Sequence, residues 1–174
     1  MTTTFLLRSG IALFVFSVAA QGAPAADSPP PPAAPAYAVP DFGGTADRAL
    51  IAMKQRAEDL HITGVAVVAY AAGDSVASWS SKMLVVGAMT KAPSGSDKGS
   101  NLLGIAYAKA SEMASTLKDS GSGARPPMTG EFGWQGGVVR RGKSGILITS
   151  FSGGRSEDDV SVSQAGVAVL AATF

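Results

Sequence analysis

Proline placement divides this chain of 174 residues into two parts. Seven of the ten prolines lie between residues 24 and 40, and Pro29–Pro32 follow one another without interruption. Proline lacks a backbone N–H and fixes φ, so this stretch can form neither a helix interior nor a central strand. We predict an extended, polyproline-like linker over residues 27–40. It is either a plain spacer or a ligand for an aromatic-lined groove. The fold is therefore expected within residues 41–174.

The segment before the linker has the order of a secretory signal peptide. Met1–Arg8 carries one positive charge and no acid, Ile11–Ala20 is an apolar run, and small residues follow up to Ala26. These features predict a signal peptide over residues 1–26, cleaved between residues 20 and 26. The apolar run is shorter than the ~20 residues that a membrane span needs. We therefore expect a periplasmic or secreted protein without an integral span, the alternative being an uncleaved anchor.

Composition excludes several functional classes. The chain has no cysteine, which rules out disulfides, iron–sulfur clusters, zinc-thiolate sites and thiol nucleophiles. His61 is its only histidine, so no multi-histidine metal site can form. Fourteen basic residues against thirteen acidic ones give a net charge of +1, without the basic excess typical of nucleic-acid binders. Neither a nucleophile elbow nor a P-loop occurs. We leave catalysis open and favour a non-enzymatic function.

The pattern of apolar residues predicts an α+β fold. Apolar residues recur at helical spacing in two segments, and acidic residues near the C-terminus indicate the start of a third helix. Two pairs of short apolar runs joined by turn residues predict antiparallel hairpins. This order indicates a mainly antiparallel sheet of four or five strands with helices packed on it. The expected helices are 46–60, capped by Thr45, 102–117, and one capped by Ser156; the expected strands are 64–71, 75–81, 138–139 and 146–151.

Two segments resemble a known family. Gln135-Gly136-Gly137-Val138, followed by Gly142, and Ser152-Gly153-Gly154, followed by Glu157 and Asp159, are similar to the closing motifs of the GlcG/HbpS-like haem-binding (haem-degrading) domain family. The upstream matches are Ala57-Glu58-Asp59-Leu60, Ala71-Ala72-Gly73 and Lys109-Ala110. The resemblance covers nearly all of residues 41–174 and implies a profilin-like fold, haem as ligand and a homo-oligomer. The sequence departs from the pattern at Tyr70, where the family usually has Asp, and at Val139, where it has Pro.

Three residues are candidates for contact with haem if it binds. His61, at the end of the first helix, is a possible iron ligand; the alternative is a partly exposed histidine that caps helix carbonyls. Tyr70 could ligate ferric haem or stack on the porphyrin, or be a core aromatic residue. Arg155, beside the Ser152–Gly154 turn, could meet a propionate, or merely flank a self-capped helix.

These observations favour an exported small-ligand-binding protein that binds or handles haem. The alternative is a non-catalytic interaction or sensor-partner module that keeps the fold without a cofactor. Titration with haemin distinguishes the two.

Overall fold

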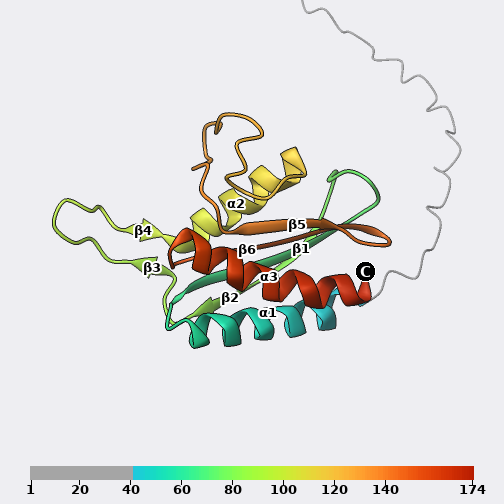
Figure 1. Cartoon of the computed structure of the whole chain (residues 1–174), viewed down its shortest axis with the longest axis horizontal. Coiled ribbons are helices and arrows are strands. Elements are labelled where there is room, and N and C mark those ends of the chain that lie inside the picture. The colour runs from blue at the N-terminus through green and yellow to red at the C-terminus, as the bar shows by residue number, and fades with distance from the viewer. Residues whose placement is uncertain (1–40) are drawn as a thin grey trace, which may run out of the picture. The chain divides into compact units, whose positions relative to one another are not determined.

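A computed structural model describes residues 41–174, and the predictions for the signal peptide and the linker lie outside these residues. The described chain is an α+β domain with an antiparallel sheet, as the sequence predicts (Figure 1). The helices are α1 (Phe42–Asp59), α2 (Leu102–Thr116) and α3 (Ser156–Thr173). The strands are β1 (Gly64–Ala72), β2 (Ser80–Val86), β3 (Thr90–Lys91), β4 (Ser100–Asn101), β5 (Gly137–Arg141) and β6 (Gly145–Ser152).

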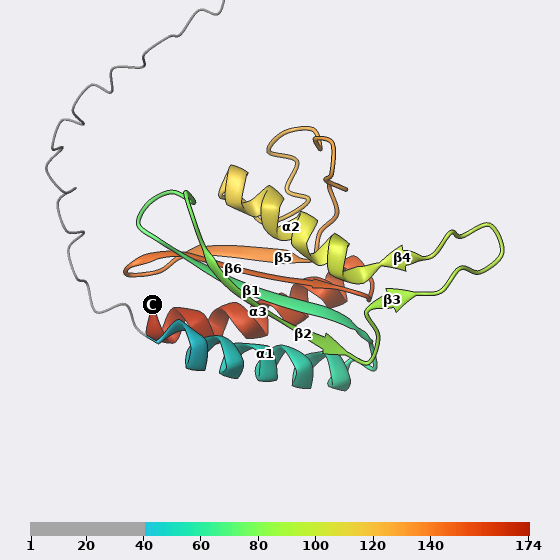
Figure 2. The same cartoon turned by 180° about the vertical axis from the view of Figure 1, so that it is seen from behind.

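The main sheet has four strands in the order β2-β1-β6-β5, all antiparallel to their neighbours. Helices α1 and α3 cover one face and α2 covers the other (Figures 1 and 2). The small β3–β4 pair projects beyond the main sheet as a separate hairpin. The sheet is therefore buried on both faces, which explains why β1 and β6 are almost continuously buried.

Alternate residues of β1 supply the two cores. Ala66, Val68 and Tyr70 pack in the cluster beneath α1 and α3, whereas Val65 and Val67 pack against α2. This alternation follows from the two-residue period of a strand. The last helix lies close on the first, because Gly166 sits against Met53 and Thr149. The lack of a side chain at Gly166 therefore permits close packing of α3 on α1 and on the sheet.

Two predicted helix caps are wrong. Asp41, not Thr45, caps α1, since its carboxylate accepts a hydrogen bond from Gly44 N at 3.1 Å. The helix extends one turn further because Phe42 packs on Tyr70 and Phe174. At α3, Ser156 is the first helical residue and the capping position is Arg155, which makes no side-chain capping bond.

The second predicted strand is displaced. The alternation around Val76 and Trp79 predicts a strand over residues 75–81, but β2 begins only at Ser80. Val76 and Trp79 instead belong to the connection that leads into β2, and they pack on the cluster beneath α2. Packing of a loop thus produces the same alternation as a strand. Within residues 41–174, no helix combines the length and apolarity needed to cross a membrane.

Candidate functional site

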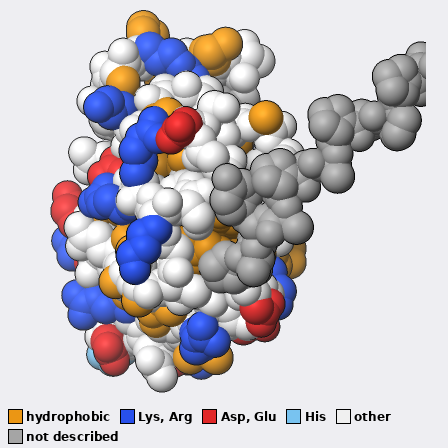
Figure 3. Space-filling model, turned by 90° about the vertical axis from the view of Figure 1, so that its right-hand side faces the viewer, with side chains coloured by type: hydrophobic (Ala, Val, Ile, Leu, Met, Phe, Trp, Pro, Cys, Tyr) orange, Lys and Arg blue, Asp and Glu red, His pale blue; other side chains and the backbone are white. Residues whose placement is uncertain are grey.

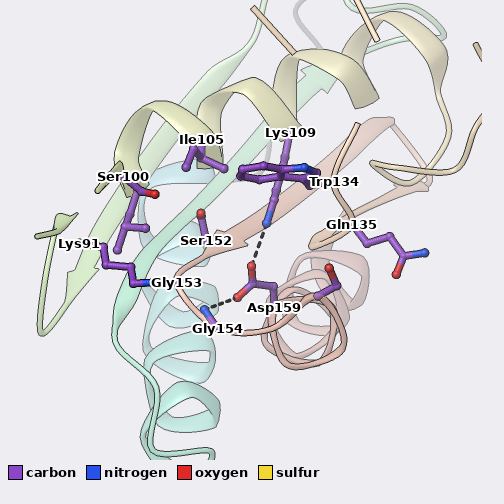
Figure 4. Close-up of a pocket in the computed structure, with 12 residues that line it drawn as sticks. Lys91, Ser100, Ile105, Lys109, Trp134, Gln135, Ser152, Gly153, Gly154 and Asp159 are labelled. Atoms are coloured by element: carbon purple, nitrogen blue, oxygen red, sulfur yellow. Dashed lines mark hydrogen bonds and ion pairs between the residues drawn. The ribbon is translucent and has the colours of Figure 1, made fainter. Parts of the chain in front are cut away.

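A polar cavity of about 170 Å³ lies where α2 and α3 begin (Figure 4). Ile105 and Lys109 of α2 form one side, and the turn Ser152–Gly154 that joins β6 to α3 forms another. Asp159 of α3 lies at the bottom, and Trp134 closes the cavity from the loop before β5. The cavity thus gathers residues from three parts of the chain that are distant in sequence: α2, the loop before β5, and the end of β6 with the start of α3.

A buried ion pair forms the floor of the polar cavity. Lys109 Nζ lies 2.8 Å from Asp159 Oδ2, and the two side chains are only 3% and 4% exposed. Lys109 Nζ also donates to Phe151 O at 2.8 Å, and Asp159 Oδ1 accepts from Gly154 N at 2.8 Å (Figure 4). Asp159 therefore also holds the turn that precedes its own helix.

Burial opposes both charges of this pair. Desolvation lowers the pKa of Lys109 and raises the pKa of Asp159, while their mutual attraction and hydrogen bond offset part of each shift. Backbone N–H groups of the Gly153–Gly154 turn further favour the Asp159 carboxylate. The floor is polar but carries no net charge while both groups are ionised. It can hydrogen-bond a ligand without selecting strongly for an anion.

Glycine at position 136 permits this arrangement. Gly136 has a φ of 129°, and a Cβ there would collide with Lys109 Nζ and lie 2.8 Å from Asp159 Cβ. No L-residue with a side chain fits that conformation and space easily. The glycine of the Gln135-Gly136-Gly137 motif is therefore needed to leave space for the Lys109–Asp159 ion pair.

Two exposed aromatic residues stand beside the cavity. Phe132 and Trp134 stack with ring centroids 4.8 Å apart, and they are 46% and 51% exposed. We call this pair the aromatic wall. It borders a second hollow of about 410 Å³ that shares Ser100, Ile105 and Trp134 with the polar cavity. The cavity and this hollow together form one site, the α2–α3 groove, with a flat apolar part and a polar end.

An ion pair holds the loop that carries the aromatic wall. Arg125 donates to both carboxylate oxygens of Glu131, at 2.6 and 2.7 Å, and to Ser115 Oγ of α2 at 2.9 Å. The hydrogen bonds from Arg125 and from Met128 N lower the pKa of Glu131 to about 2. A planar guanidinium binding a carboxylate through two bonds fixes orientation as well as distance. The loop is therefore anchored to α2 on the side of the groove.

Of the three residues predicted to contact haem, two, His61 and Arg155, lie at the end of the sheet that holds the α2–α3 groove. His61 follows α1 with a φ of 55°, is exposed, and precedes Ile62, whose side chain contacts the space beside Gly154. Arg155 follows Gly154 directly; its side chain is 85% exposed and donates to Asp158 at 3.3 Å. Neither side chain lines the α2–α3 groove. Their roles as haem contacts stay predictions.

Tyr70 lies at the opposite end of the sheet. It is six residues beyond Gly64 along β1, which corresponds to roughly 20 Å in a strand. Its ring packs on Phe174 with centroids 4.4 Å apart, and its hydroxyl contacts Ser144 O at 3.1 Å and Ser144 Oγ at 3.0 Å. Tyr70 is therefore a buried, hydrogen-bonded aromatic residue in this structure, remote from His61 and Arg155.

The basic residues Arg140 and Arg141 at the end of β5, and Lys143 in the turn to β6, lie at the same end of the sheet as Tyr70. Figure 3 looks onto this end and shows Lys and Arg side chains across it, with acidic side chains among them. Arg140 pairs with Asp119 and Arg141 with Asp74, both at 3.0 Å and both exposed. These arginines are solvated and partly neutralised.

Among residues 41–174, no group of three or more His, Asp or Glu side chains is placed to hold a metal ion.

Sequence reasoning missed the most prominent residues of the groove. Lys109 and Asp159 are identified from the sequence only as parts of the family resemblance, with no pairing between them. Their pairing joins positions 50 apart, which no local pattern indicates. Phe132 and Trp134 did carry a signal, since two aromatic residues in a Gly- and Pro-rich stretch have no helix or strand face to occupy.

Comparison with known proteins supports the fold. No family model and no curated protein matches the chain. Among solved structures, the chain is similar to a crystal structure of a PduOC:heme complex, with a TM-score of 0.54 and 15% identity over 75% of this chain and 95% of that one. This likeness agrees with a profilin-like α+β fold of the kind that the GlcG/HbpS resemblance implies.

Proposed function

We propose that this protein binds a flat, amphipathic small ligand in the α2–α3 groove, and that haem is this ligand. The observation that carries the proposal is the aromatic wall, half-exposed and directly beside a cavity with a polar floor. Large exposed aromatic surfaces in a pocket favour stacking with planar ligands. Binding, with the protein exported, is the function we propose, and it requires no catalytic residue.

Several features of the groove suit a porphyrin. Phe132 and Trp134 offer a flat apolar surface for the ring. Lys91 lines the polar cavity, and its side chain is 65% exposed. Its ammonium pairs with Asp97 only loosely, at 3.5 Å, so the side chain is free to turn towards a propionate. The similar structure named above is a PduOC complex with heme, on the same type of fold.

The groove does not supply an iron ligand. Its described lining residues include no His, Tyr or Met, which are common protein ligands of haem iron. We propose His61 for this role because its side chain is exposed and it directly precedes Ile62 and Thr63, which contact the Gly153–Gly154 turn. Bound haem would supply a redox-active iron centre. The side chains of the groove would hold and orient its ring and carboxylates.

Titration with haemin and with iron-free protoporphyrin tests these assignments. We expect a saturable Soret shift for the wild type and about tenfold weaker binding of both ligands by Trp134→Ala, because an aromatic contact is lost. His61→Ala should change the haemin spectrum while leaving protoporphyrin affinity unchanged. A wild type without saturable binding, or Trp134→Ala with wild-type affinity for both ligands, would contradict the proposed site. An unchanged haemin spectrum in His61→Ala would remove only the iron-ligand role.

A second candidate function is an interaction module without a cofactor. The polar cavity alone, at about 170 Å³, is smaller than the ~300–1,000 Å³ usual for ligand pockets, and only the hollow beside the aromatic wall, at about 410 Å³, reaches that range. This observation favours a fold that has kept its shape without the ligand. Failure of both porphyrins to bind would support this candidate.

A further inference from the structure

A second groove lies on the other side of α2. It has a volume of about 460 Å³ and runs between the β1–β2 connection and the helix. Tyr107, Ser111 and Ala114 form its helical side at spacings of four and three residues, which places them on one face. Val76 and Trp79 form the opposite side. Lys109, which belongs to the α2–α3 groove, projects from another face of the same helix. We call the second site the Trp79–Tyr107 groove.

The chemistry of the Trp79–Tyr107 groove suits an extended proline-rich peptide. No charged residue lines it, and both aromatic rings are only half-buried. Aromatic-lined grooves bind polyproline II segments because the rings pack against proline and the segment loses little entropy on binding. The indole N–H and phenol O–H can in addition donate hydrogen bonds to peptide carbonyls.

This chain contains a segment with the matching chemistry. Residues 28–40 include six prolines and no charged residue, and they end at Pro40, directly before the capping residue Asp41 of α1. The match is between an uncharged groove and an uncharged proline-rich segment.

We propose that the Trp79–Tyr107 groove binds residues 28–40 of a second copy of this chain. The segment directly precedes α1, and α1 packs on the sheet face opposite to α2 (Figures 1 and 2). At ~3.1 Å per residue, thirteen residues of polyproline II would extend about 40 Å, enough to reach a neighbouring copy. This contact gives the predicted homo-oligomer a physical basis that is independent of haem.

Complementation between two variants tests the proposal. Ser111 is exposed on the groove face of α2, so Ser111→Arg blocks the groove without removing a core side chain. Replacing Pro29–Pro32 with alanine removes the ligand. For the chain starting at Asp27, the predicted exported form, we expect sedimentation velocity to show association in the wild type and monomers for each variant. A mixture of the two variants should associate again, because one provides an intact groove and the other an intact segment.

A peptide titration tests the contact directly. A labelled peptide of residues 27–40 should bind the chain that carries the four alanines, and Ser111→Arg should weaken this binding about tenfold. Trp134→Ala is the matched control, because it removes an exposed aromatic residue outside this groove and should leave peptide binding unchanged. A monomeric wild type at tens of micromolar, equal binding of a peptide with alanines at positions 29–32, or an unaffected Ser111→Arg would each overturn the proposal. Equal urea unfolding of all variants excludes misfolding as the cause.

Discussion

The two ends of the four-stranded sheet treat their aromatic side chains in opposite ways. At the Tyr70 end, the ring clusters with the rings of Phe42 and Phe174, and the hydroxyl is hydrogen-bonded to Ser144. At the end with the α2–α3 groove, Phe132 and Trp134 stack on each other and stay half-exposed beside a hollow. We call the Tyr70 end the closed end, because its aromatic rings are buried. We call the end with the α2–α3 groove the open end, because its aromatic rings are half-exposed.

The backbone reinforces this difference. Phe174 O accepts hydrogen bonds from the N–H groups of Lys143 and Ser144, so the C-terminus of α3 seals the Tyr70 end. At the other end, the long connection from α2 to β5 folds over the groove and is fixed by Arg125 and Glu131. Satisfied polar groups and full burial indicate a structural aromatic residue. Exposed rings on an anchored loop indicate a binding surface.

We expect the largest loss of stability when the Lys109–Asp159 ion pair at the open end is broken. Lys109→Met leaves the Asp159 carboxylate buried without its partner, and we expect a loss of about 3–5 kcal/mol in the free energy of unfolding. Urea denaturation at pH 7 measures this loss. The double variant Lys109→Met/Asp159→Leu should recover most of it, because neither charge stays buried. A single variant as stable as the wild type would show that the pair is not buried as described.

A smaller effect is expected at the closed end. Tyr70→Phe keeps the ring packed against Phe42 and Phe174 and removes only the hydroxyl bonded to Ser144. We expect a loss of about 1 kcal/mol in the free energy of unfolding and no change in haemin affinity. Urea denaturation and a Soret titration of the same preparation give both values. A strong loss of haemin affinity would mean that ligand reaches the closed end, and the contrast between the ends would fail.

We expect the smallest effect from the protonation of Glu131 in the loop that carries the aromatic wall. The pKa of Glu131 is lowered to about 2 from its usual 4.5, so its pairing with Arg125 stabilises the folded loop above pH 4.5. This contribution is lost as the pH falls from 4.5 towards 2, where the folded carboxylate becomes protonated. Trp134 fluorescence in a Trp79→Phe background should therefore be constant from pH 7 to 5 and change only below 4.5. In Glu131→Gln, the transition attributable to this group should be absent.

The sequence predicts the parts of the fold that depend on local patterns. Helical spacing over residues 102–117 predicts α2 almost to the residue, and the hairpin of β5 and β6 follows from its turn residues. The start of β2 is wrong because Val76 and Trp79 alternate in a loop that packs on the core. Local periodicity cannot separate these two origins of the same pattern.

The candidate site is less predictable, for a physical reason. The floor depends on Lys109 and Asp159, whose pairing exists only after α2 and α3 have packed on opposite faces of the sheet. Tyr70 illustrates the converse, because its chemistry suggests a ligand while its position gives it a role in packing. A residue type predicts what a side chain can do, whereas burial and partners determine whether it is free to do it.

Hydrogen–deuterium exchange with and without haemin tests the contrast between the ends most directly. We expect saturating haemin to slow exchange in peptides that cover residues 130–136 and 152–156, which border the α2–α3 groove. Peptides over residues 70–73 and 142–146, at the closed end, should exchange at unchanged rates. Protection confined to the Tyr70 end, or no protection at the groove despite saturable binding, would contradict the assignment of the ligand to the open end.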